Sequence, residues 1–171
     1  GRTATELHTF PGFSASVCQI RPQSEGSVEI RSPDPAAAPK VHFNYLATEF
    51  DRRSMLQGLR QLLRVMRQPA LAPYNGGAIE FDGNADSDAA LFDLLRARGG
   101  SAMHAARTCR MGVDAGAVLD TSLRVRGVGR LRVIDASSMP EISAGNTNAP
   151  VIMMAEKGAD LILEDARGGA S

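Results

Sequence analysis

The chain has 171 residues, 43% of them hydrophobic, and its 19 basic and 19 acidic residues cancel. That length suffices for one domain burying roughly 70% of its unfolded surface. Because the charges balance and no long run of one sign occurs, neither nucleic acid nor an anionic membrane surface is indicated as a partner. No apolar stretch of about 18 residues and no charged-then-apolar leader is visible, so we expect no membrane span and no signal peptide.

The two cysteines, Cys18 and Cys109, form no disulfide framework and no Cys-x-x-Cys pair. This usage favours a reducing compartment and predicts a cytoplasmic location. The chain opens at Gly1 without linker-like composition, which suggests a portion of something larger.

Three strands are predicted near the N-terminus. Residues 15–21 and 27–31 alternate apolar and polar around the turn-forming residues 24–26, which indicates a hairpin. The Pro/Ala-rich stretch 33–39 cannot continue a ladder. Residues 41–46 alternate again and predict the third strand.

Two helices follow. Thr48 and Asp51 make a capping-box-like start, and apolar residues then recur at helical spacing until Pro69 stops the helix: Met55, Leu59, Leu62 and Met66. After a loop over 73–86, a second amphipathic helix ends at Gly99 and buries Leu91, Leu94 and Leu95.

A histidine at the start of the last third, His104, lies between a Gly/Ser-rich approach (99–103) and the residues 108–112. A lone histidine is more often structural or on the surface. These neighbours, however, favour a sharply folded loop that directs one side chain into a cleft. An imidazole in such a position can accept a hydroxyl proton at neutral pH.

Two other chemistries remain open for this histidine. Cys109 lies five residues away and could form a Cys/His nucleophile pair, although no thiol-protease signature or oxyanion hole accompanies it. A zinc site is less favoured still, because the two cysteines and three histidines lack ligand spacing. We expect the other histidines, His8 and His42, on the surface.

The segment after this loop predicts a strand over 131–135 that ends at an acidic residue and is followed by the small pair 136–137. Alone, this is an ordinary strand-end turn. Residues 146–148 then supply helix caps, and Pro150 suits the first turn of an amphipathic helix over about 151–164. Such a helix start attracts an anion or an electron-rich carbonyl.

Several ordered blocks in residues 99–163 resemble the C-terminal signature of the glucose-methanol-choline (GMC) family of flavin-dependent alcohol oxidoreductases, whose choline-dehydrogenase-like branch has the same order. A histidine precedes these blocks, which are Thr-Cys-Arg-Met-Gly (108–112), Leu-Arg-Val-Arg-Gly-Val (123–128), the run 131–140, Gly-Asn-Thr-Asn-Ala-Pro (145–150) and Ala-Glu-Lys (155–157). Residues 13–74 are similar to the family's substrate-binding domain.

The resemblance implies an enzyme that oxidises a small-molecule alcohol with FAD, in which hydride passes to flavin N5 while a base removes the hydroxyl proton. It implies His104 as that base and Asn146 as the hydrogen-bond partner of the substrate oxygen. Two departures lie beside the histidine: Ala105 and Arg107 stand where relatives have proline and glycine.

The resemblance also implies how FAD would be contacted. Asp135 and Ala136 would meet it mainly through backbone groups, Asn146 would adjoin it, and Thr147 and Asn148 would face its pyrimidine edge. The family's Gly-x-Gly-x-x-Gly fingerprint for the FAD pyrophosphate is absent from this sequence. We therefore expect an N-terminal FAD-binding segment or subunit as a partner.

Together these observations predict an α+β fold, with an antiparallel sheet covered by helices and a C-terminal strand-loop-helix segment that completes the FAD domain. We expect a substrate-binding domain over 1–100, a catalytic and flavin-facing segment over 101–171, and no metal. The alternative is a stand-alone, non-catalytic ligand- or partner-binding domain on the same scaffold.

Overall fold

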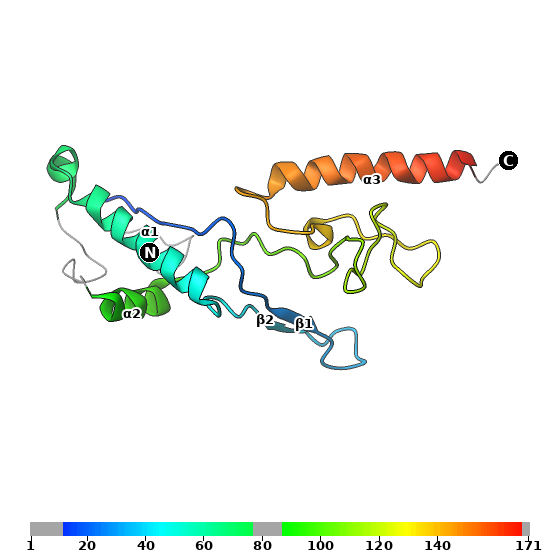
Figure 1. Cartoon of the computed structure of the whole chain (residues 1–171), viewed down its shortest axis with the longest axis horizontal. Coiled ribbons are helices and arrows are strands. Elements are labelled where there is room, and N and C mark those ends of the chain that lie inside the picture. Colours follow the sequence, from blue (N-terminus) through cyan, green and yellow to red (C-terminus); the bar gives the residue numbers. More distant parts are fainter. Residues whose placement is uncertain (1–11, 77–86, 169–171) are drawn as a thin grey trace. The chain divides into compact units, whose positions relative to one another are not determined.

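The computed structural model describes residues 12–76 and 87–168, which form two compact units (Figure 1). Of the described residues, the first unit comprises 12–19, 46–76 and 87–100, and the second comprises 20–45 and 101–168. The strands and helices fall in separate segments of the chain, which confirms the predicted α+β class.

The first unit is helical. Helix α1 spans Glu49–Met66, the short 3-10 helix η1 spans Pro69–Tyr74, and helix α2 spans Asp88–Arg98. The hydroxyl of Thr48 accepts the backbone N–H of Asp51, and the hydroxyl of Ser87 caps α2 in the same way. The two predicted helices and the stop at Pro69 are confirmed.

Leucines from α1 and α2 form the core of this unit. Leu91 is 1% exposed and packs with Leu59 and Leu63, while Val17 lies against the same cluster. The carboxylate of Asp51, itself buried, accepts a hydrogen bond of 2.8 Å from the side-chain amide of Gln19.

The antiparallel sheet lies in the second unit, and its pairing corrects the predicted hairpin. Strand β1 (Ser27–Glu29) pairs with β2 (Lys40–His42), with Val28 opposite Val41. Residues 15–21 form no strand. The Pro/Ala stretch, which cannot itself join a ladder, serves as the connection between the two strands.

The rest of this unit is a loop-rich segment packed under one long helix. It includes the 3-10 helix η2 (Ala136–Ser138) and helix α3 (Asn148–Gly168), which starts earlier than predicted. Four buried residues make its core: Leu119, Leu123, Met139 and Met154. The strand predicted over 131–135 is reduced to a single bridge between Arg124 and Arg132, and no further ladder forms there.

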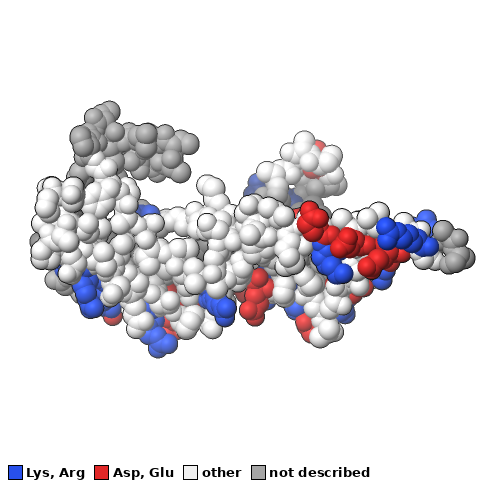
Figure 2. Space-filling model, turned by 90° about the horizontal axis from the view of Figure 1, so that it is seen from above, with Lys and Arg blue, Asp and Glu red and all other residues white. Residues whose placement is uncertain are grey.

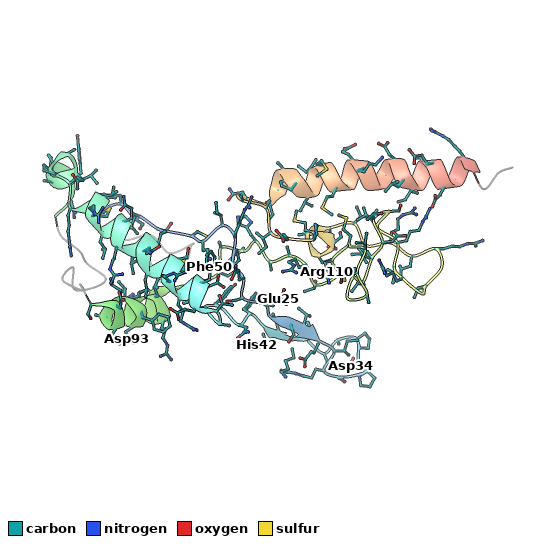
Figure 3. All side chains as sticks on the ribbon, in the orientation of Figure 1. Glu25, Asp34, His42, Phe50, Asp93 and Arg110 are labelled. Atoms are coloured by element: carbon teal, nitrogen blue, oxygen red, sulfur yellow. The ribbon has the colours of Figure 1, made fainter. Side chains whose placement is uncertain are left out.

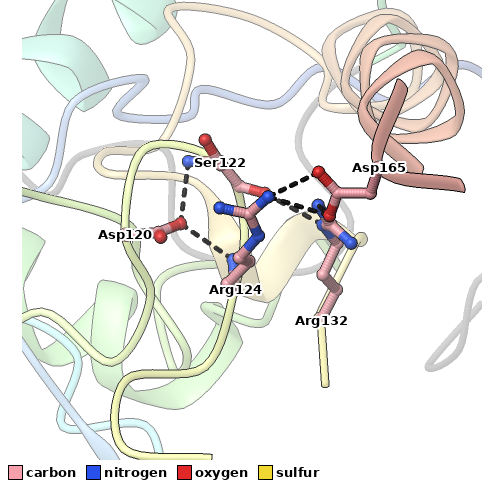
Figure 4. Close-up of polar contacts among 5 residues, drawn as sticks. All are labelled: Asp120, Ser122, Arg124, Arg132 and Asp165. Atoms are coloured by element: carbon pink, nitrogen blue, oxygen red, sulfur yellow. Dashed lines mark hydrogen bonds and ion pairs between the residues drawn. The ribbon is translucent and has the colours of Figure 1, made fainter. Parts of the chain in front are cut away.

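An ion-pair cluster fastens the C-terminal half of α3 to this loop segment (Figure 4). The Asp165 carboxylate accepts hydrogen bonds of 2.6 and 2.8 Å from Arg124 and one of 2.7 Å from Arg132. The Asp120 carboxylate accepts the backbone N–H groups of Ser122 and Arg124, at 2.8 and 2.9 Å. The cluster thus joins the turn at residues 120–124 to helix α3.

The exposed side of α3 carries charges of both signs next to one another (Figure 2). They come from Glu156, Lys157, Asp160, Glu164 and Arg167, all exposed. This interspersed pattern is typical of a solvated helix face and offers no single-sign surface. Within the described residues, no helix combines the length and hydropathy needed to cross a membrane.

Candidate active site

The predicted histidine lies on a tightly turned loop. Met103, just before it, has a φ of +59° and donates its N–H to the Ser101 hydroxyl at 2.9 Å. His104 is half-buried, and its Nδ1 lies 3.0 Å from Oγ1 of Thr147, within hydrogen-bond distance. The loop that carries this histidine, residues 103–111, is called the histidine loop, and the contact ties it to the start of α3.

The same loop then runs along the turn that follows the predicted strand. Three backbone N–H groups of the loop donate to three successive carbonyls of η2: Arg107 to Ala136 at 3.4 Å, Cys109 to Ser137 at 3.0 Å, and Met111 to Ser138 at 2.9 Å. This ladder holds the loop beside residues 136–138.

Asp135 shapes that turn. Its carboxylate accepts the N–H of Ser137 at 2.7 Å, and its own N–H donates to the hydroxyl of Ser138, which completes a capping box. The Ser138 hydroxyl also donates to the Asp135 carbonyl at 2.6 Å. Asp135 is exposed and Ala136 is half-buried, so both remain at the accessible edge of the site.

The start of α3 supplies the third part of the site. Thr147 is 8% exposed, and its carbonyl accepts the N–H of Val151 at 3.0 Å, so the helix begins at this point. Asn146 and Asn148 on either side are exposed. The start of α3, with an exposed asparagine on either side of Thr147, therefore lies next to the histidine through the contact at Thr147.

A charged hollow of about 820 Å³ is lined by residues of this loop and by residues 140–144. Arg107 and Arg110 line it, and the Arg110 guanidinium binds both carboxylate oxygens of Asp114, at 2.7 and 2.9 Å. That hydrogen bonding holds the pKa of Asp114 well below its ordinary value and raises the pKa of Arg110.

The structure brings most of the predicted residues into one region of the second unit. His104 contacts Thr147, next to Asn146, and the loop backbone contacts Ala136. Cys109 is half-buried against the Leu119 core cluster. Among the described residues, there is no group of three or more His, Cys, Asp or Glu side chains that could hold a metal ion.

Two features of the site were not predicted. One is the Thr147 hydroxyl as the partner of His104, for which the sequence gives no signal beyond a possible cap. The other is the geometry of Arg107, which has a φ of +78° and an ion pair with Glu25. The sequence shows that arginine replaces the glycine of relatives at this position, but it does not show that Arg107 pairs with Glu25. His42 is exposed as predicted, and His8 lies outside the described residues.

The comparison with family models assigns the chain. A model described as GMC oxidoreductase matches residues 22–155. The chain belongs to the GMC oxidoreductase family and corresponds to its C-terminal region.

Known relatives agree with this assignment. The oxygen-dependent choline dehydrogenases of Burkholderia ambifaria and Burkholderia pseudomallei are 45% and 44% identical over 95% and 96% of this chain. The chain spans only 28% of the length of either relative.

Solved structures show the same fold. Pyridoxine 4-oxidase from Mesorbium loti matches with a TM-score of 0.78 and 32% identity, over 82% of this chain and 28% of its own. An FAD-dependent oxidoreductase from Chaetomium thermophilum matches with a TM-score of 0.80 and 28% identity, over 86% of this chain and 26% of its own.

Proposed function

We propose that the chain is the C-terminal part of an FAD-dependent alcohol oxidoreductase and supplies the side chains that handle the alcohol. The observation that carries the proposal is the 3.0 Å contact between His104 Nδ1 and Thr147 Oγ1. It orients the imidazole at the start of α3, beside Asn146. Choline, named in the Burkholderia relatives, is the first substrate we propose.

We propose different roles for the two ring nitrogens of His104. In the tautomer with Nδ1–H, this group donates to the Thr147 hydroxyl, and Nε2 keeps its lone pair and accepts the hydroxyl proton of the alcohol. The Asn146 side-chain amide, exposed beside this contact, donates a hydrogen bond to the alcohol oxygen. Proton removal and oxygen binding are thus divided between two side chains.

The residues present fit one edge of FAD. The start of α3 and the exposed amides of Asn146 and Asn148 offer N–H donors suited to electron-rich carbonyls, and Thr147 sits among them. Asp135 and Ala136 would border the cofactor at the neighbouring turn. When bound, FAD supplies the acceptor for the hydride of the alcohol carbon.

The pyrophosphate of FAD requires residues that this sequence lacks, so we propose an N-terminal FAD-binding segment or subunit as partner. The two-stranded sheet supports this. Apolar side chains of its strands and flanks remain open to solvent, with Ile30 91%, Val28 52%, Val41 49%, Phe43 48% and Tyr45 56% exposed. Two strands alone are marginally stable, and such a contiguous patch is typical of a surface that further polypeptide covers.

A base substitution tests the proposal in the protein assembled with its flavin-binding part. His104→Ala should slow flavin reduction by the alcohol by roughly 10²- to 10⁴-fold, the range for loss of a positioned general base. Flavin content should stay nearly constant, because the imidazole does not hold the cofactor. Stopped-flow absorbance measures the reduction, and an unaltered rate would contradict the role of His104. An assembled protein that remains colourless would favour the non-catalytic binding domain instead.

A further inference from the structure

Residue 107 adopts a backbone conformation that an arginine rarely takes. Its φ of +78° lies in the left-handed region, where a Cβ is disfavoured and glycine is favoured. Its carbonyl accepts the N–H of Arg110 at 3.0 Å and closes a tight turn three residues after His104. The conformation of residue 107 therefore sets how the histidine loop turns toward η2.

The Arg107 side chain is held from outside its own loop. Its Nη1 lies 2.9 Å from Oε1 of Glu25, whereas its Nε is buried and has no hydrogen-bond partner. The side chain is only 35% exposed. Since Nε gains no compensating bond, the contact with Glu25 is the interaction that favours this placement.

Glu25 is presented by a firmly placed backbone next to β1. The Asn44 side-chain amide donates to the Glu25 carbonyl at 2.8 Å. The next residue, Gly26, passes so close to β2 that an added Cβ would clash with the His42 carbonyl oxygen. The Glu25 carboxylate also contributes, after the larger effect of Asp114, to the raised pKa of Arg110. Glu25 thus faces the loop from the sheet (Figure 3).

We propose that the Glu25–Arg107 ion pair is an anchor that positions the histidine loop, residues 103–111, against η2 and the start of α3. Arg107 is a positioning residue, because it contacts neither the imidazole nor Thr147. The anchor would set the distance between His104 and Thr147 by fixing the turn that follows the histidine. The effect of the anchor on catalysis rests on the proposed function, whereas its effect on the position of the loop does not.

Amide hydrogen exchange in the full 171-residue chain tests the anchor without reference to catalysis. Glu25→Gln removes the carboxylate of the ion pair and leaves the amino-acid sequence of the histidine loop unaltered. Arg107→Ala removes the guanidinium of the same pair. Each should speed exchange at the Cys109 and Met111 amides by about two- to fivefold, the range for loss of one partly exposed ion pair. Arg107→Lys should restore most of the protection, because the charge is kept.

Lys40→Ala provides the matched control, since it breaks the exposed Lys40–Glu29 pair across β1 and β2 without touching the loop. It should leave exchange at both amides unaltered. Glu25→Gln combined with Arg107→Ala should have no more effect than either change alone. Unaltered exchange in Glu25→Gln, or additive effects in the double variant, would overturn the anchor.

Two further readouts separate positioning from general stability. The ¹⁵N shift of His104 Nδ1 should move in Glu25→Gln and stay constant in Lys40→Ala. In the assembled enzyme, Glu25→Gln should lower the rate constant of flavin reduction about two- to fivefold without changing the alcohol's apparent dissociation constant. Faster exchange and a moved shift with unaltered reduction would uphold the anchor and contradict His104 as the base.

Discussion

Helix α3 approaches the loop segment closely at Gly158, and this contact gives a quantitative prediction. Gly158 is buried, and a Cβ built there would lie 2.7 Å from both Cδ1 and Cγ2 of Ile134. Ile134 is β-branched, so rotation about χ1 cannot move both carbons away together. We therefore expect Gly158→Ala to displace either the helix or Ile134.

Two opposing effects determine how much Gly158→Ala changes the free energy of unfolding. Alanine in a helix interior gains about 1 kcal/mol over glycine, whereas overpacking of a formed core costs about 1–3 kcal/mol. Distances below 3 Å to a stiff side chain place the cost in the middle of that range. The net expectation is a loss of about 1 kcal/mol in the free energy of unfolding.

Urea unfolding followed by circular dichroism measures this loss. Gly168→Ala is the matched control, because its added Cβ meets no atom within 4 Å beyond its chain neighbours and the backbone of α3 itself, and it should be neutral or slightly stabilising. In an Ile134→Ala background the clash disappears, so Gly158→Ala should instead stabilise by about 1 kcal/mol. A neutral or stabilising Gly158→Ala with Ile134 present would refute the close seating of α3.

Two more predictions concern the partners of α3. Thr147→Val removes the hydroxyl beside His104 Nδ1 and should slow flavin reduction about two- to tenfold, the equivalent of one hydrogen bond. Thr147→Ser keeps the hydroxyl and should keep the rate. Equal rates of flavin reduction in the two variants would contradict a role for the contact. The pKa of Asp165 is lowered by hydrogen bonds from Arg124 and then Arg132, so its contribution to stability is present above the unfolded pKa of about 4 and is lost as pH falls through the lowered value. Asp165→Asn should therefore reduce the melting temperature at pH 7 and approach wild type in acid, and a difference independent of pH would contradict the pairing.

The helices of this chain could be predicted because their signals are local. The Thr48 cap, the stop at Pro69 and the end at Gly99 lie within or next to the elements they define. Strand pairing is not local. Residues 15–21 alternate like a strand, yet Val17 packs with the leucines of α1 and α2, and β1 takes its partner from beyond the proline-rich stretch. Hydrophobic alternation cannot distinguish these outcomes.

The candidate site divides in the same way. His104 and Asn146 could be proposed from ordered sequence blocks, because each lies in a short motif. The Thr147 hydroxyl on the imidazole and the Glu25–Arg107 pair arise only when distant segments meet. Arg107, moreover, has a positive φ, a backbone conformation that sequence preference disfavours for arginine.

We propose that this chain supplies the alcohol-oxidising side of a flavin site. The most direct measurement is anaerobic mixing of choline with the assembled flavoprotein while the visible absorbance of oxidised flavin is recorded. We predict that the absorbance bleaches in the wild-type protein and bleaches far more slowly in His104→Ala. A protein that contains flavin yet stays oxidised with choline and with other small primary alcohols would contradict this role of the chain.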